Sequence, residues 1–245
     1  MAERLSQLFR VNKELNPKIF KKEKMRPDVR KHLLKVVRQF LEFTGIKVPI
    51  KDVTLTGSSA GYSYNDLSDL DVHVVFDSKK LDMLGGAVKE LFSAKSALFN
   101  DSYDAKLGKG DIELYYQDSE EEHTSDAVYS IKDDMFLKEP TKGQKVKANR
   151  KEVLEKADDL KRMIDYMEAK LASGKSIEAD IKYFKEKLKK MRQRGLDAEG
   201  IYSPENLAFK VLRNDGYLAK LKNLNRKDIS KKLTLSEGVR AVLSL

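Results

Sequence analysis

The sequence contains no cysteine and no tryptophan, and only five of its 245 residues are proline. Without cysteine, neither a disulfide framework nor a thiolate metal site can form. No apolar run approaches the roughly 18 residues needed to cross a bilayer. The N-terminal stretch is too rich in charged residues for a secretory signal. We therefore expect a soluble, cytoplasmic protein with no membrane partner.

Charge is abundant and unevenly distributed. Charged residues make up 36% of the chain, and the net charge is +9. Residues 1–51 carry +9, residues 52–140 carry −11, and residues 141–245 carry +11. Two interpretations remain open. The basic flanks are the solvated faces of helices, or they attract a polyanion toward an acidic centre that holds cations.

The first 140 residues have the pattern of an α+β domain. Pro27 suits the first turn of an amphipathic helix over 27–44, and Gly45 is a suitable stop. The remaining expected elements are strands at 53–56, 70–76 and 112–116, a helix at 79–93 and an edge strand within 127–137. The polar stretch that follows residue 56 is predicted as a loop with one helical turn.

The last 105 residues read as all-helical. Apolar residues three and four apart predict a helical hairpin over 144–194, with Gly195 and Gly200 marking a turn. Ser203 and Pro204 have the cap and first-turn chemistry of a further helix, so we expect helices over 203–245. The predicted domains are therefore 1–140 and 141–245.

The residues with the clearest chemistry lie around the first two strands. Gly57 follows a strand and lets the chain turn with its N–H groups exposed, while Ser58 and Ser59 add hydroxyls. Such a turn can hold phosphate oxygens. Asp69 and Asp71 are two residues apart at a strand, so their carboxylates share one face. Two close carboxylates repel each other unless cations lie between them, and hard oxygen ligands favour Mg²⁺ or Mn²⁺.

A third carboxylate is available on the strand near residue 113. Glu113 lies between Ile112 and Leu114, and Asp111 lies two residues earlier on the same face. Three carboxylates can hold two metal ions about 3.5–4 Å apart, an arrangement suited to attack of a hydroxyl on a phosphate.

The stretch TLTGSSAGYSYNDLSDLDVHVVF, followed by GDIELYYQD, resembles the DNA-polymerase-β-like nucleotidyltransferase superfamily. The signature is Gly-Ser, a gap of about ten residues, Asp-apolar-Asp and a later carboxylate on another strand. The resemblance covers residues 27–118, and it implies a nucleotidyltransferase core with a mixed or antiparallel sheet flanked by helices.

The resemblance also implies roles. Gly57 and Ser58 would contact the triphosphate of an NTP substrate, Asp69 and Asp71 would bind both metal ions, and Glu113 would serve the catalytic metal ion. Glu113 fits the family pattern better than Asp111 because it has apolar neighbours on both sides. Of the remaining polar residues, His73 is expected to be a hydrogen-bonded structural residue, although it shares the strand face of the two aspartates.

We therefore expect a metal-dependent enzyme that transfers a nucleoside monophosphate from an NTP such as ATP to an acceptor hydroxyl. The basic flanks favour an RNA or DNA 3′ end as the acceptor. A protein side chain, as in an AMPylator or toxin, and a small molecule stay open. A non-catalytic nucleic-acid-binding module on the same core is the alternative from a different class. The oligomeric state, the preferred NTP and the pathway are not encoded in any motif.

Overall fold

The computed structural model describes residues 6, 8–66, 68–78, 85–121, 125–142 and 146–233. Internal contacts divide the chain into two units, Arg10–Lys145 and a helical unit of Met1–Phe9 with Val146–Leu245. The division falls five residues beyond the predicted boundary at residue 140. The first nine residues group with the helical unit, whereas the sequence pattern assigned them to the core.

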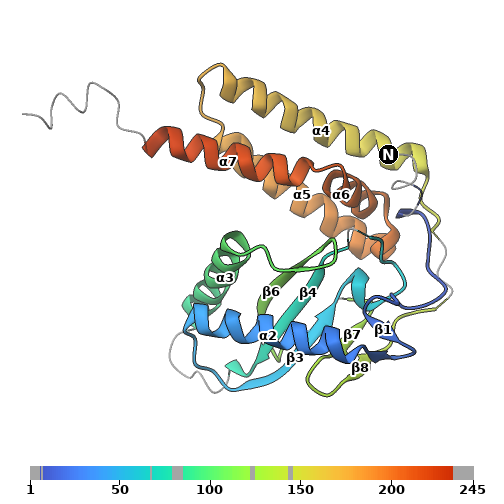
Figure 1. Ribbon diagram of the computed structural model, residues 1–245. Coiled ribbons are helices and arrows are strands. Elements are labelled where there is room, and N and C mark those ends of the chain that lie inside the picture. Colours follow the sequence, from blue (N-terminus) through green and yellow to red (C-terminus); the bar gives the residue numbers. More distant parts are fainter. Residues whose placement is uncertain are drawn as a thin grey trace, which may run out of the picture. The chain divides into compact units, whose positions relative to one another are not determined.

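The α+β unit contains a hairpin, two long helices and a sheet (Figure 1). The hairpin strands are β1 (Phe20–Lys21) and β2 (Lys24–Met25). The helices are α2 (Pro27–Thr44) and α3 (Gly85–Ser102), and the single turn is η1 (Ser58–Ala60). The sheet strands are β3 (Ile50–Thr56), β4 (Leu70–Phe76), β5 (Lys106–Leu107), β6 (Gly110–Asp118), β7 (Val128–Ser130) and β8 (Met135–Lys138).

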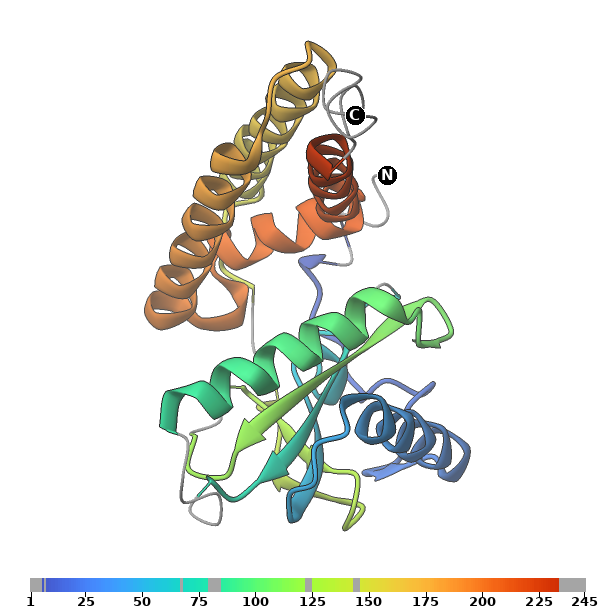
Figure 2. The same cartoon turned by 90° about the vertical axis from the view of Figure 1, so that its left-hand side faces the viewer.

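The sheet is mixed, and its strands are ordered β5-β6-β4-β3-β7-β8. β4 pairs antiparallel with β3 and parallel with β6, so β4 lies between the Gly57 turn and the strand of Glu113. The parallel pair requires a crossover, which α3 provides. Figure 2 shows α3 (green) beside β6.

One face of this sheet forms the hydrophobic core. Val53, Leu55, Val72, Val74 and Leu114 alternate along their strands and pack against the apolar stripe of α2. The aromatic rings of α2 and α3 meet above this face, with the Phe40 and Phe99 centroids 5.1 Å apart. The opposite side chains of the same strands are polar, and they carry the residues of the candidate site.

The sequence predicted several boundaries correctly. Helix α2 runs over the expected residues and ends at Gly45, whose φ of 65° is the left-handed conformation that glycine tolerates. Strand β4 also has the expected bounds. The helix predicted at 79–93 is confirmed over 85–93 but continues to Ser102 as α3, and residues 79–84 lie outside the described part. The single edge strand within 127–137 is instead the hairpin β7–β8.

The helical unit contains α4 (Arg150–Ala172), α5 (Glu178–Glu199), η3 (Gly200–Tyr202), α6 (Pro204–Asn214) and α7 (Tyr217–Leu233). Ser203 caps α6 as expected, because its side chain accepts a hydrogen bond from the Asn206 amide at 3.3 Å. The chain turns again at Gly216, where φ is 80°, so the predicted run after residue 203 is two helices. Among the described helices, none is long and apolar enough to span a membrane.

Gly195 does not mark the turn that the sequence suggested. It lies inside α5, which continues to Glu199. A Cβ atom at this position would lie 2.6 Å from Ser203 Oγ and 2.7 Å from Glu205 Cβ. Glycine is therefore used here for the close approach of α5 to the start of α6, and Gly200, with φ of 74°, makes the turn.

Candidate active site

The candidate active site begins at the end of β3, where Gly57 turns the chain. Its φ of 74° and ψ of −159° are open to glycine and strained for other residues. A Cβ atom here would overlap Asp71 Oδ2, so glycine is also required by the space. The turn therefore lies directly against one of the predicted carboxylates.

The register of the strands places the carboxylate of Glu113 beside that of Asp71. Asp71 of β4 pairs with Thr56 of β3 on one side and with Glu113 of β6 on the other. Paired residues on neighbouring strands present their side chains to the same face. Asp69 precedes β4 by one residue and has the same parity as Asp71, so it joins this polar face.

The next row of side chains forms a polar support for the carboxylates. His73 of β4 pairs with Thr54 and with Tyr115. The Nε2 atom of His73 lies 3.2 Å from Thr56 Oγ1, and its ring centroid is 5.5 Å from that of Tyr115. These contacts fit the expected structural role of His73, because they tie β3, β4 and β6 together across the face.

The Tyr115 hydroxyl donates a hydrogen bond to Glu113 Oε2. Burial raises the pKa of the Tyr115 phenol, and the negative charges of Glu113, Asp71 and Asp69 raise it further. Tyr115 therefore stays protonated and remains a donor to Glu113 across the physiological range.

Ser58 and Ser59 differ in their surroundings. The Ser58 hydroxyl is half-exposed and donates to Ser68 Oγ at 3.1 Å. Ser59 is only 1% exposed, and its hydroxyl donates to the carbonyl oxygen of Asp69 at 2.6 Å. The geometry thus gives Ser59 a structural role, in which it fixes the backbone of Asp69, and leaves Ser58 as the serine of the turn that can face a phosphate.

Asp111, the alternative third carboxylate, has a different environment. Its side chain is 57% exposed and lies 3.7 Å from Lys106 Nζ on the edge strand β5. Glu113 instead lies opposite Asp71 in the parallel register. The structure therefore brings Glu113 into the row of the site and pairs Asp111 with a surface cation.

The donor set fits a hard divalent cation in chemistry, since it consists of carboxylate oxygens. The register of β4 and β6 also places two of the carboxylates in adjacent positions. Within the described residues, however, no three His, Asp or Glu side chains already converge on one point. Glu113 accepts the hydrogen bond of the Tyr115 hydroxyl, so a metal site that includes Glu113 would require its side chain to turn toward Asp71.

Sequence reasoning missed the residues that support the site. Ser125 accepts a hydrogen bond from the Gly57 amide at 3.0 Å, and Ser68 accepts another from the Asn65 amide at 2.9 Å. Tyr115 could have been found, because it follows Glu113 by two residues on the same strand face. Ser125 follows the acidic loop after β6, and no local pattern connects it to Gly57, 68 residues away.

The comparisons with protein-family models and with curated proteins found no relative of this chain. No protein-family model matches the chain, and no curated protein matches it. The residues of this site are therefore the evidence for function.

Proposed function

We propose that this protein is a metal-dependent nucleotidyltransferase, which moves a nucleoside monophosphate from an NTP to an acceptor hydroxyl. The observation that carries this proposal is the row Thr56–Asp71–Glu113 across three strands, with Gly57 packed against Asp71. The row joins a phosphate-holding turn to a cluster of carboxylates. This is the combination that transfer of a phosphoryl group requires.

In the proposed reaction, an oxygen of the acceptor forms a bond to the α-phosphorus of the NTP. The bond from that phosphorus to the bridging oxygen breaks, and pyrophosphate leaves with the bonding electrons. Glu113 accepts the proton of the attacking hydroxyl. Bound Mg²⁺ or Mn²⁺ would neutralise the charge that develops on the phosphate oxygens.

The chain's own residues would hold the reactants in line. Gly57 lets the backbone approach the triphosphate without a side chain in the way, and Ser58 offers a hydroxyl to a phosphate oxygen. Asp69 and Asp71 would hold the cations. The hydrogen bond from Tyr115 would keep the Glu113 carboxylate on the site face until the rotamer changes.

A nucleic acid 3′ end is the acceptor that the charge distribution favours. The flanks on either side of the acidic central segment carry +9 and +11, and the site itself carries the negative charge. The lysine and arginine side chains of these flanks would neutralise the phosphates of a bound polyanion. The intact set of three carboxylates favours an enzyme over a non-catalytic binding module.

The experiment incubates the protein with each α-labelled NTP, with Mg²⁺ or Mn²⁺, and with single-stranded RNA, single-stranded DNA or a cellular protein extract. Labelled RNA or DNA that appears only with metal and active protein supports the proposal. The matched control for substitution of a site carboxylate is Asp104→Asn, which removes an exposed carboxylate in the same unit. Labelled protein would redirect the proposal to a protein-modifying enzyme, and no label on any acceptor would overturn it.

A further inference from the structure

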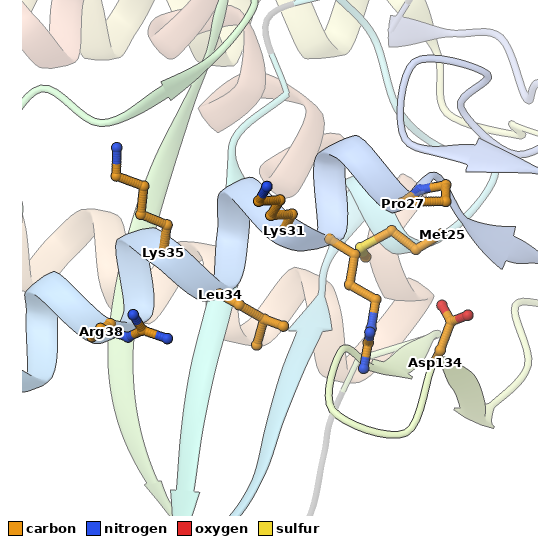
Figure 3. Close-up of a pocket in the computed structure, with 8 residues that line it drawn as sticks. Met25, Pro27, Lys31, Leu34, Lys35, Arg38 and Asp134 are labelled. Atoms are coloured by element: carbon orange, nitrogen blue, oxygen red, sulfur yellow. The ribbon is translucent and has the colours of Figure 1, made fainter.

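A basic groove lies on the α+β unit along helix α2. Its volume is about 600 Å³. The groove is bounded by β2, by α2 and by the turn between β7 and β8, as Figure 3 shows. The residues that line it are Met25, Pro27, Arg30, Lys31, Leu34, Lys35, Arg38 and Asp134. Four of these eight are cationic and one is acidic.

Three of the cations form a row on successive turns of the helix. Lys31, Lys35 and Arg38 are spaced four and three residues apart, which places them on one side of α2. With a rise of 1.5 Å per residue, the row extends about 10 Å along the helix axis. All three side chains are exposed.

The other two charged residues of the groove are used within the fold. Arg30 donates to the carbonyl oxygens of Ile131 and Lys132 at 2.7 and 2.6 Å, which ties α2 to the β7–β8 turn. Asp134 accepts a hydrogen bond from the Tyr129 hydroxyl at 2.5 Å. These hydrogen bonds fix the positions of Arg30 and Asp134 beside the row of three cations.

Lys31, Lys35 and Arg38 form no ion pair or hydrogen bond with any residue that the structure describes. Helix α4 shows the contrast, because Lys156 pairs with Glu152 and Arg162 with Asp159 one turn away. Like charges one turn apart destabilise a helix by roughly 0.2–0.5 kcal/mol per pair. No ion pair among the described residues offsets the repulsion within this row of α2.

We propose that this α2 groove binds the phosphate backbone of a nucleic acid. An exposed row of cations along one helix matches the charge and the linear shape of such a backbone. The apolar residues that line it do not favour a membrane surface, since Met25 is buried and Leu34 is only partly exposed.

The groove is separate from the candidate active site. Helix α2 packs on the apolar face of the sheet, and Asp71 and Glu113 belong to the polar face. To serve as the acceptor, a nucleic acid held in this groove must pass around the sheet so that its end reaches the carboxylates. This inference rests on the proposed function only where it identifies the bound nucleic acid as the acceptor.

The test measures binding of labelled single-stranded RNA and DNA, without NTP, over a series of salt concentrations. The variant carries Lys31→Gln, Lys35→Gln and Arg38→Gln. The matched control carries Lys89→Gln, Lys109→Gln and Lys132→Gln, which removes three exposed lysines of the same unit outside the groove and the same charge. Circular dichroism and urea unfolding confirm that both variants fold, and the single variant Lys35→Glu provides a milder second test.

We expect the slope of log affinity against log salt to fall by about 2 in the α2 variant, since each phosphate contact on a single strand contributes roughly 0.7. The control should retain most of the slope. An equal loss of slope in both variants would overturn the proposal that the groove binds nucleic acid. Strong binding to vesicles of anionic lipid together with weak binding to nucleic acid would also overturn it.

Binding and chemistry fail in different ways. Salt-dependent binding through α2 with no nucleotide transfer would support the groove and overturn the proposed function. Nucleotide transfer together with unchanged nucleic-acid binding in the α2 variant would support the proposed function and overturn binding through the groove.

Discussion

Gly57 and Asp71 are in such close contact that no side chain fits between them. We expect Gly57→Ala to displace Asp71 and to strain a backbone whose φ is 74°. With ψ at −159° this conformation is essentially restricted to glycine, so the strain alone costs about 1–3 kcal/mol, and the displacement should reduce nucleotide transfer much more than this loss of stability explains. Urea unfolding and transfer assays measure the two effects separately.

The matched control for this prediction is Gly45→Ala. Gly45 has a similar φ of 65°, but a Cβ atom there has open space around it. Its ψ of 10° lies in the left-handed helical region, so alanine there should cost about 1–2 kcal/mol and leave the transfer activity unchanged. Equal transfer activity in the two variants would contradict the assignment of the Gly57 turn to the active site.

Asp69→Asn and Asp71→Asn should reduce transfer by roughly 100-fold or more, because cations at the site would supply several kcal/mol of charge stabilisation. Both variants should fold, and in metal-free buffer they should be somewhat more stable than the parent, since clustered carboxylates repel one another. Transfer kinetics and thermal unfolding with and without EDTA are the measurements. Near-normal transfer by either variant would contradict the assignment of the metal ligands.

Glu113, rather than Asp111, should complete the set of carboxylates. Glu113→Gln should lower the turnover number strongly and affect NTP binding less, because this carboxylate is assigned to the attacking hydroxyl. Asp111→Asn changes a surface pair with Lys106 and should leave turnover within a few-fold. Single-turnover rates and NTP affinity distinguish the two. The opposite ranking would mean that the third carboxylate is Asp111.

The alkaline stability of the protein should depend on Tyr129. Burial raises the pKa of this phenol, and the hydrogen bond to Asp134 raises it further. A raised pKa means that the folded protein retains a proton that the unfolded chain releases near pH 10. The contribution of Tyr129 is therefore complete below about pH 10 and is lost as the pH rises above that value.

Tyr129→Phe should reduce this loss of stability above pH 10. It should also destabilise the protein at pH 7 by about 1–3 kcal/mol, because the buried Met25 amide loses its acceptor at 2.9 Å. Urea unfolding at pH 7 and pH 10.5 tests both effects, with Tyr183→Phe as the control, since Tyr183 is 61% exposed. An unchanged pH dependence would show that Tyr129 ionises equally in both states.

Local patterns in the sequence predicted much of the fold. Helix α2 and strand β4 were placed correctly because each combines a clear period with a stop signal, such as Gly45. Gly195 was misread because its reason is tertiary. The start of α6 occupies the space that a side chain would need.

The candidate site was proposed from the sequence in part. Gly57, Ser58, Asp69 and Asp71 lie within 15 residues, and their spacing together with the family resemblance led to the proposal. The choice between Glu113 and Asp111 depends on the register of two parallel strands, which no local pattern encodes. The inward direction of Ser59 was likewise hidden, because exposed and buried serines look the same in a sequence.

The parallel pairing of β4 with β6 also sets an order of assembly. The turn and the two aspartates belong to one antiparallel hairpin, whereas Glu113 comes from 42 residues beyond Asp71, after the crossover through α3. Contacts so distant along the chain form late and slowly in folding. A chain with the β3–β4 hairpin formed and β6 undocked would have most of the phosphate-binding groups but not the proposed proton acceptor. Under the proposed function, catalytic competence thus requires the docking of β6 and appears only after that step.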